Sequence, residues 1–342
     1  MSDPGERPPR RPRYSGKHPR GFAQKYKERD PERYPDTVAK VLASGKTPAG
    51  AHLPILMEEC LAALDLRDGD LGVDATLGYG GHAARILAQI SPAGKLLGLD
   101  IDPLEQPKTV ARLRALGYPE SAFEAVQANY AGLAKVLAGR GLAGVDFVLA
   151  DLGCSSMQLD DPARGFSFKT AGPLDMRMNP ARGVTAAEWL LKVPAAKLAV
   201  ALREHADEPQ AERLAEALAG RGFPNTLGLA RAVRECVGGR DEDLVELTVR
   251  RVFQALRIAV NEEFSALDAF LRVLPDCLKA GGRAVVLTFH SGEDRRVKKA
   301  LQAAHRSGAF ASISDGVVTA SPEERRRNPR SSAAKLRWAI KA

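Results

Sequence analysis

The sequence has few cysteines and no long apolar run among its 342 residues. A transmembrane helix needs about 20 consecutive apolar residues, so a membrane span is excluded. The cysteines lie far apart, without a CxxC pair or zinc-ligand spacing, so we expect no disulfide framework and no bound metal. They are Cys60, Cys154, Cys236 and Cys277. The basic N-terminal stretch lacks the apolar segment of a secretory signal, and a reducing cytoplasm is the expected location.

Charge is distributed unevenly along the chain. The formal net charge is +8, but residues 1–50 carry +6 and residues 321–342 carry +5, which leaves −3 for the rest. Basic ends around a mildly acidic body are typical of proteins that bind nucleic-acid phosphates. The alternative is that both ends are solvated tails that only keep the protein soluble.

The composition and patterning divide the chain into four segments. Residues 1–50 are rich in Arg, Lys and Pro and predict a basic arm without stable structure. An apolar core follows in two parts, residues 51–158 and 251–342. Residues 159–250 have no strand-like run and show helical periodicity, so we interpret them as a helical insert.

Short apolar runs alternate with helical patterns on either side of the insert. The runs are residues 71–78, 95–100, 145–153 and 281–290. This alternation indicates βαβ units and an α/β fold with a parallel sheet. A single long helix is predicted over roughly 243–274, and Asp315-Gly316 predicts a β-hairpin.

A glycine-rich segment follows the first predicted strand and reads Asp74-Ala-Thr-Leu-Gly78-Tyr-Gly80-Gly81-His82. Glycines between a strand and a helix let a ligand approach the backbone, where the helix N-terminus offers unpaired N–H groups. Asp100 ends the next strand, where an acid can accept hydrogen bonds from both ribose hydroxyls. The segment therefore predicts a site for an adenosine-containing cofactor.

Two cofactors fit this segment. Gly78, Gly80 and Ala83 match the dinucleotide pattern GxGxxG/A, which allows NAD. S-adenosylmethionine enzymes share the architecture and often carry an acid just before the loop, where it faces the cationic amino-acid end of the ligand. Asp74 stands at that position, which favours S-adenosylmethionine. The alternative for Asp74 is a hydrogen bond to the loop backbone.

Asp151 ends the third predicted strand, so Asp74, Asp100 and Asp151 should converge at the carboxyl edge of the sheet. Buried unpaired carboxylates are costly, so three of them exceed what packing needs. A carboxylate there can accept an N–H hydrogen bond from an amine that is being methylated and stabilise its developing positive charge. Asp151 is the candidate acceptor, with Ser155 and Ser156 as helpers; a turn cap is the alternative for Asp151. Without a GxSxG motif, a serine nucleophile is disfavoured.

Eight sequence blocks between residues 52 and 337 resemble the bacterial small-subunit rRNA cytosine-N4 methyltransferase family, known as RsmH or MraW, and follow one another in the family's order. The longest and most specific block is DLGCSSMQLDDPARGFSFKTAGPLDMRM. The others are HLPILMEE, DATLGYGGH, GLDIDP, TAAEWL, FQALRIAVNEE, GGRAVVLTFHSGEDRRVK and GVVTASPEERRRNPRSSAAKLR.

The resemblance implies a class I S-adenosylmethionine-dependent methyltransferase, with a Rossmann-like, mostly parallel sheet and an inserted helical substrate domain. Its implied reaction is methylation of the exocyclic N4 of a cytidine in the decoding region of 16S rRNA. The implied partner is the small ribosomal subunit, and we expect a monomer or homodimer. The family's cofactor contacts correspond here to Gly80, Gly81, His82, Asp100, Tyr130, Asp151 and Gln158. Tyr130 and Gln158 enter through the resemblance alone, and Tyr130 replaces a residue that is usually Phe.

The chain departs from the family pattern around its helical insert. The family's HPAxRTFQA segment reads VELTVRRVFQA here, and Gly292 replaces a large apolar residue in FHSLEDR. These differences leave two alternatives open. One is an altered paralogue that only binds RNA during subunit assembly, and the other is methylation of a different RNA cytidine.

Three further features have both a functional and a structural interpretation. His290 ends a predicted strand and either lies near the target base or is structural. The side chains of Phe166, Phe168, Met176 and Met178 either hold a flipped base or pack on the core. The arginines between residues 325 and 330 either contact phosphates or form a solvated charge run.

Overall fold

The computed structural model describes residues 54–239 and 241–342. The predictions for the basic arm at residues 1–50 lie outside this part of the chain. Within the described residues, eight strands form one sheet in the order β3-β2-β1-β4-β5-β8-β6, with β7 also paired to β8. The strands are β1 (Leu71–Asp74), β2 (Lys95–Asp100), β3 (Phe123–Gln127), β4 (Val145–Asp151), β5 (Leu278–Thr288), β6 (Phe310–Ile313), β7 (Val318–Thr319) and β8 (Lys335–Lys341).

The first five strands run parallel, and β8 runs antiparallel between β5 and β6. The four apolar runs of the sequence form β1, β2, β4 and β5, so the predicted α/β class is confirmed. The strand order reverses its direction between β1 and β4. Ligands of open α/β sheets bind beyond the carboxyl ends of the strands at such a reversal.

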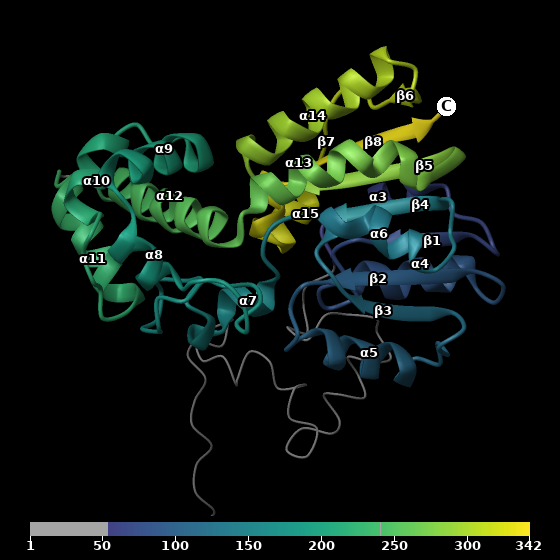
Figure 1. The fold of residues 1–342 in the computed structure, drawn as a ribbon, viewed down its shortest axis with the longest axis horizontal. Coiled ribbons are helices and arrows are strands. Elements are labelled where there is room, and N and C mark those ends of the chain that lie inside the picture. Colours follow the sequence, from purple (N-terminus) through teal and green to yellow (C-terminus); the bar gives the residue numbers. More distant parts are fainter. Residues whose placement is uncertain (1–53, 240) are drawn as a thin grey trace, which may run out of the picture.

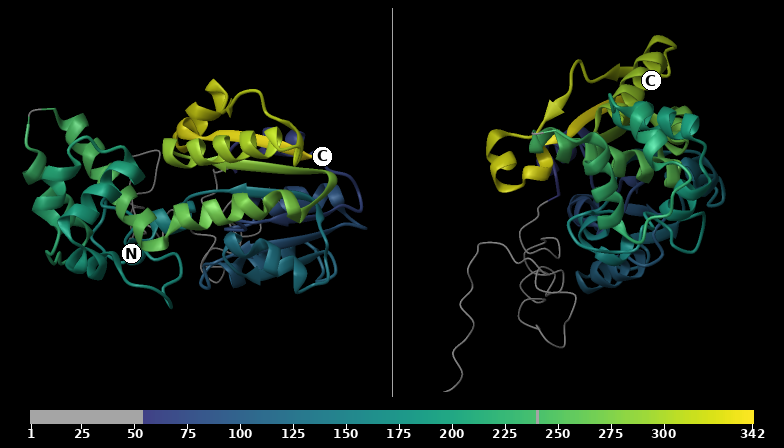
Figure 2. Two further views of the ribbon diagram at one scale, coloured as in Figure 1. Left: turned by 45° about the horizontal axis from the view of Figure 1, so that its top comes forward. Right: turned by 90° about the vertical axis from the view of Figure 1, so that its left-hand side faces the viewer.

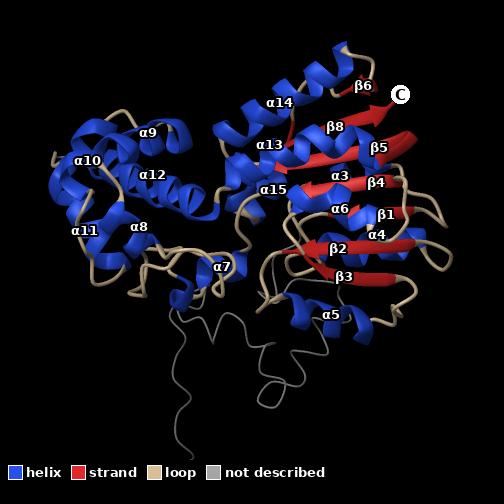
Figure 3. Ribbon diagram, in the orientation of Figure 1, coloured by secondary structure: helices blue, strands red, loops and turns tan. Residues whose placement is uncertain are grey.

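Helices cover both faces of this sheet (Figure 3). One face packs on α6 (Leu133–Ala138), α13 (Glu263–Val273) and α14 (Ser291–Arg306). The other packs on α3 (Met57–Leu64), α4 (Gly81–Ile90) and α5 (Gln106–Ala115). The alternation of strand side chains produces two cores. Val148 and Ala150 of β4 enter the first, and Phe147 and Leu149 enter the second.

A helical unit with its own apolar core lies beside the sheet (Figure 1; Figure 2, left). Its helices are α8 (Ala186–Lys192), α9 (Ala195–Ala206), α10 (Ala211–Leu218), α11 (Thr226–Val237) and α12 (Glu242–Asn261). The predicted insert boundary at residue 250 falls within α12, whose residues Val249, Val252 and Leu256 all enter this core. The division into domains stays a prediction.

Two local predictions are wrong. The expected single helix over 243–274 breaks at Glu262, which takes a left-handed conformation with φ 51° and separates α12 from α13. The expected hairpin at Asp315-Gly316 does not form, because β6 and β7 do not pair with each other. Both pair with β8 along one edge, while β5 occupies its other edge.

Candidate active site

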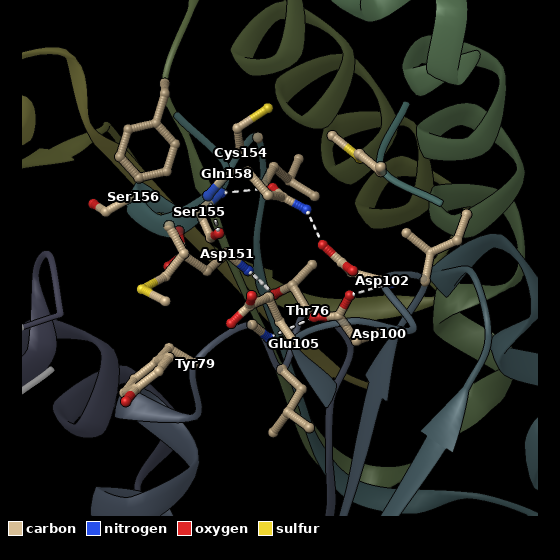
Figure 4. A pocket seen from close by; sticks show the side chains of 18 of the residues that line it. Thr76, Tyr79, Asp100, Asp102, Glu105, Asp151, Cys154, Ser155, Ser156 and Gln158 are labelled. Atoms are coloured by element: carbon tan, nitrogen blue, oxygen red, sulfur yellow. Dashed lines mark hydrogen bonds between the residues drawn. The ribbon is translucent and has the colours of Figure 1, made fainter. Parts of the chain in front are cut away.

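A cavity of about 420 Å³ opens beyond the carboxyl ends of β1, β2 and β4 (Figure 4). The sheet contributes the strand-end loops, including the glycine-rich segment. The opposite wall comes from the helical side, with Met178, Arg257 and Asn261. The short η5 helix (Pro329–Ala333) near the C-terminus adds Arg330 and Ala333. The cavity therefore has one wall from the sheet and another from the insert and its junction.

The glycine-rich loop needs glycine for both conformation and space. Gly78 and Gly80 have φ angles of +48° and +70°, which residues other than glycine rarely adopt. A Cβ on Gly80 would lie 2.8 Å from Thr109 Cγ2, and one on Gly81 would lie 2.5 Å from Pro54 Cγ. Gly80 also caps α4, so the N–H groups of its first turn face the cavity region. This geometry suits a ligand that lies against the backbone.

Asp100 stands at the end of β2 and lines the cavity. Its Oδ2 accepts a 2.6 Å hydrogen bond from the backbone N of Gly78, and its Oδ1 accepts one of 2.8 Å from Asp102 N. Burial raises the pKa of Asp100 to about 6, while these backbone bonds oppose that rise. The carboxylate is thus held rigidly, as a partner for ribose hydroxyls requires.

Asp151 ends β4, and its backbone N donates a 2.6 Å hydrogen bond to Thr76 Oγ1 (Figure 4). Its Oδ2 lies 3.6 Å from Nδ1 of His82. Within the described residues, Asp151 Oδ1 and His82 Nε2 are buried and have no hydrogen-bond partner. Such atoms are costly unless a ligand or water satisfies them.

The ionisation of this pair follows from its enclosure. Burial, followed by the charges of Asp74 and Glu293, raises the pKa of Asp151 to about 8. Burial lowers the pKa of His82 to about 4, so the imidazole is neutral near pH 7. A cationic ligand near Asp151 would favour the ionised carboxylate, because opposite charge nearby lowers the pKa of a carboxyl group.

Two of the predicted site residues do not line the cavity. Asp74 is 1% exposed, and its Oδ1 accepts a 3.1 Å hydrogen bond from Thr76 N, which matches the loop-backbone alternative. His290 caps the N-terminus of α14, and its Nε2 lies 3.1 Å from Glu293 Oε1. Neither residue belongs to the lining of the cavity, and their functional roles stay predictions.

The two predicted serines lie on the loop after β4, and both line the cavity. Ser155 forms a capping box with Gln158 at the start of α7 (Ser156–Asp160). Its Oγ accepts from Gln158 N, and Gln158 Oε1 accepts from Ser155 N. Ser156 Oγ contacts a guanidinium nitrogen of Arg330. Both hydroxyls therefore have protein partners, Gln158 within α7 for Ser155 and the distant Arg330 for Ser156.

Tyr130 and Gln158, which only the resemblance indicated, also line the cavity. The Tyr130 ring meets Phe270 edge-on with centroids 5.5 Å apart, and its hydroxyl donates to the carbonyl of Glu263 over 3.4 Å. Gln158 Nε2 donates to Asp102 Oδ2 over 3.0 Å. Both side chains are thus fixed in the wall beside Asp100.

Sequence reasoning missed several residues of the wall. Asp102, Arg257, Asn261 and Glu263 all line the cavity. Arg257 donates two hydrogen bonds, of 2.8 and 2.9 Å, to the Glu263 carboxylate. The family resemblance could have pointed to these residues, because they lie in the blocks GLDIDP and FQALRIAVNEE. Nothing in their local pattern distinguishes a cavity wall from a solvent-exposed helix face.

The phenylalanine and methionine side chains mostly pack on the core of the helical unit. Phe166 and Met176 are buried in that core, and Phe168 meets Phe253 with ring centroids 5.0 Å apart. Only Met178 of this group lines the cavity. Packing is therefore the observed role of the first three, and Met178 remains available to a bound base.

The chain matches a known family and is similar to several named proteins. The family model of the MraW methylase family matches residues 49–342. The chain belongs to the MraW methylase family. It is 46% identical over 97% of its length, and 93% of the relative, to "Ribosomal RNA small subunit methyltransferase H 1" of Lachnoclostridium phytofermentans. It is 43% identical to proteins named "Ribosomal RNA small subunit methyltransferase H 1" in Agathobacter rectalis, with 97% of each chain covered, and "H 2" in Alkaliphilus metalliredigens, with 100% covered.

Membership of the MraW methylase family decides between the two cofactors in favour of S-adenosylmethionine. The glycine at position 292, which departs from the family pattern, has a local structural explanation. A Cβ on this buried glycine would lie 2.6 Å from Phe264 Cζ and 3.2 Å from His290 Nδ1. The Phe264 ring, which also holds the Arg296 guanidinium 4.2 Å from its centroid, therefore occupies the space that a large residue at position 292 would need.

Proposed function

We propose that this protein transfers a methyl group from S-adenosylmethionine to the exocyclic N4 of a cytidine in the decoding region of 16S rRNA. The observation that supports it most is the meeting, in one cavity, of the glycine-rich loop, Asp100 and the unsatisfied Asp151 Oδ1. The MraW family match over residues 49–342 and the rRNA methyltransferase relatives support the same reaction. Small ribosomal subunits occur in the cytoplasm, where we expect the protein to act.

The residues present fit S-adenosylmethionine. The donor supplies an electrophilic methyl group on a positively charged sulfur. Asp100 would accept hydrogen bonds from ribose hydroxyls, and Gly80 and Gly81 leave the backbone open to close approach. Tyr130 offers an apolar ring near Asp100, and Asp151 offers negative charge. Asp151 Oδ1 and His82 Nε2 are buried without a hydrogen-bond partner in the described part of the chain, and a polar ligand would satisfy them.

Asp151 would also act on the acceptor amine. The N4 lone pair of cytosine is delocalised into the ring, which makes the amine a poor nucleophile. A carboxylate that accepts an N4–H hydrogen bond favours the pyramidal, more nucleophilic nitrogen and stabilises the positive charge that develops on it. Asp151 then takes the proton that the nitrogen loses. The protein's largest further contribution is to hold the two reactants in register.

A basic surface beside the cavity is the proposed contact for RNA phosphates. The exposed residues Arg325, Arg326 and Arg327 lie on α15 (Pro322–Arg327), which leads directly into η5 at the cavity wall. Arg330 lines the cavity and donates a 2.8 Å hydrogen bond to Oδ1 of Asp160 in α7. RNA that enters the cavity would thus place its backbone against this arginine surface.

Replacing Arg326 with Ala should weaken binding to small subunits severalfold and reduce the dependence of log affinity on log salt by about one. Filter binding at several salt concentrations measures both quantities. Arg306→Ala is the matched control, since Arg306 is also exposed but lies at the far end of α14. An unchanged salt slope in Arg326→Ala would show that α15 does not contact phosphate.

The decisive experiment for the reaction uses methyl-labelled S-adenosylmethionine and small subunits that lack the modification. We expect label in N4-methylcytidine at a single position, found by nuclease digestion and mass spectrometry. Label in another cytidine would support the different-target alternative. Binding of subunits without any label would support the assembly-factor alternative, which the retained Asp100 and Asp151 and the enzyme relatives disfavour.

We also propose that the helical unit recognises the RNA around the target nucleotide, because it supplies the wall of the cavity that faces the sheet. Met178 precedes its first helix, and Asn261 ends α12. These positions support a role for the unit in holding the acceptor opposite the sheet wall.

A further inference from the structure

One buried arginine connects the two walls of the cavity. Arg164 lies at the end of the short helix η3 (Pro162–Arg164), and its side chain is only 9% exposed. Its Nη1 donates a 2.7 Å hydrogen bond to Oδ2 of Asp102, which is 1% exposed. Its Nη2 donates to the backbone carbonyls of Arg177 over 3.1 Å and Met178 over 2.9 Å. One guanidinium therefore bonds to a carboxylate and to two carbonyls of the segment that precedes α8.

The carboxylate end of this connection belongs to the cofactor wall. Asp102 N donates to Oδ1 of Asp100, the proposed ribose acceptor, over 2.8 Å. Asp102 Oδ2 also accepts from Gln158 Nε2 (Figure 4). This oxygen therefore receives donors from both Gln158 and Arg164. The bond to Arg164 thus attaches to the same short segment that carries Asp100.

The carbonyl end belongs to the acceptor wall. Met178 lines the cavity, and its backbone N donates to Oδ1 of Asn261 over 2.7 Å. Asn261 Nδ2 in turn donates to the carbonyl of Met176 over 2.8 Å. Met176 has a φ of +63°, an unfavourable conformation for methionine, so the surrounding bonds hold this loop in a strained shape.

We propose that Arg164 is a positioning residue that sets the distance between the cofactor wall and the Met178–Asn261 wall, and thereby aligns the acceptor nucleotide with the methyl donor. The inference rests on the proposed function. A planar guanidinium bonds a carboxylate and two carbonyls in fixed directions, which a flexible ammonium cannot reproduce. Methyl transfer depends steeply on such alignment, since a displacement of about 1 Å can cost on the order of 100-fold in rate.

The test uses Arg164→Lys and the double variant Arg164→Met/Asp102→Asn. The double variant removes the unpaired buried carboxylate that Arg164→Met alone would leave, because such a group is strongly destabilising. Arg182→Met is the matched control, because Arg182 is an exposed arginine of the same loop region. For each protein we would measure melting temperature, S-adenosylmethionine affinity by calorimetry, and the single-turnover rate and KM with small subunits.

Compared with Asp102→Asn alone, measured in parallel, the double variant should lose on the order of 10- to 100-fold in single-turnover rate, with cofactor affinity equal to that of Asp102→Asn within about threefold. Arg164→Lys should recover part of the rate, and Arg182→Met should resemble wild type. A folded double variant with the rate of Asp102→Asn would overturn the proposal. So would a rate loss matched by an equal loss of cofactor affinity, or variants whose rate falls only in step with melting temperature. Failure of wild type to methylate any RNA would instead refute the proposed function.

Discussion

The two walls of the cavity are held in place by contacts of different range along the chain. In the sheet wall the glycine loop, Asp100 and Asp102 lie within residues 74–102, where the hydrogen bonds span at most 22 positions. Asp151 joins this segment through its bond to Thr76, across 75 positions. The bonds that join the loop around Met178 to the helical unit and to the sheet are long-range as well: Arg164 reaches Asp102 across 62 positions, and Asn261 reaches Met176 across 85 positions.

This difference favours a division of the proposed functions between the two walls. A strand, a turn and a helix in succession already place cofactor groups at a sheet edge, because parallel strands end together. The acceptor wall forms only when distant segments meet in the folded chain. We therefore expect changes in the sheet wall to alter cofactor binding or chemistry directly, and changes in the helical wall to alter alignment or stability.

The largest expected effect separates chemistry from binding within the sheet wall. Asp151→Ala should reduce the methylation rate on the order of 100-fold or more, because the charge-stabilising acceptor is lost. Its S-adenosylmethionine affinity should stay within about tenfold of wild type. Rate assays on unmodified subunits and calorimetry measure these quantities. Glu120→Ala, at an exposed acid, is the control, and full activity in Asp151→Ala would remove this residue from the mechanism.

The next test addresses the contact between α13 and α14, where Phe264 lies against Gly292. Gly292→Leu would force a side chain into the space of Phe264, and overpacking of this kind costs about 1–3 kcal/mol in the free energy of unfolding. Chemical denaturation measures the loss. Gly316→Leu is the control, because a side chain at Gly316 meets open space. In Gly292→Leu/Phe264→Ala the two costs should fail to add; simple additivity would contradict the proposed contact.

A smaller effect is expected in the glycine loop. Gly80→Ala imposes a side chain at φ +70° and brings Cβ to 2.8 Å from Thr109 Cγ2. A loop that shifts to relieve this contact and about 1–2 kcal/mol of left-handed strain no longer fits the cofactor, so cofactor affinity should fall by about tenfold. Gly117→Ala also places a side chain at a positive φ, +94°, but its Cβ meets no atom within 4 Å. If Gly117→Ala lost as much affinity as Gly80→Ala, the effect would reflect general strain rather than the loop.

The smallest effect concerns pH. Burial raises the pKa of Asp74 to about 7, that of Asp100 to about 6 and that of Asp151 to about 8. In the folded protein these carboxyls hold protons that the unfolded chain has released. Their contribution to stability is therefore present below pH 4 and lost as pH rises through about 8.

Binding of a cationic ligand favours the charged carboxylates and releases protons. Affinity for S-adenosylmethionine should thus rise severalfold, by at most about tenfold for one proton, between pH 6 and pH 7. Calorimetry in buffers of different ionisation enthalpy counts the protons released, and Asp151→Asn is the matched variant that should release fewer. Proton uptake on binding would contradict the assignment of these pKa shifts.

Much of the sheet wall could be predicted from local pattern. The strands before Asp74, Asp100 and Asp151 are continuous apolar runs, and the glycines mark the turn between β1 and α4. The sequence did not predict β3, because its residues Phe123–Gln127 include two polar side chains and lie at the sheet edge. The break at Glu262 was also invisible, because a left-handed glutamate has no signature in helical periodicity.

The amino-acid order by itself determined the α/β class, the cofactor loop and the acids at the strand ends, because these follow from short-range periodicity and from where parallel strands stop. The folded structure was needed to show that Asp74 and His290 do not line the cavity, and that Arg164 joins Asp102 to Met178. A buried polar side chain must find partners wherever the packed chain supplies them, and these range from Thr76, two positions from Asp74, to Asp102, 62 positions from Arg164.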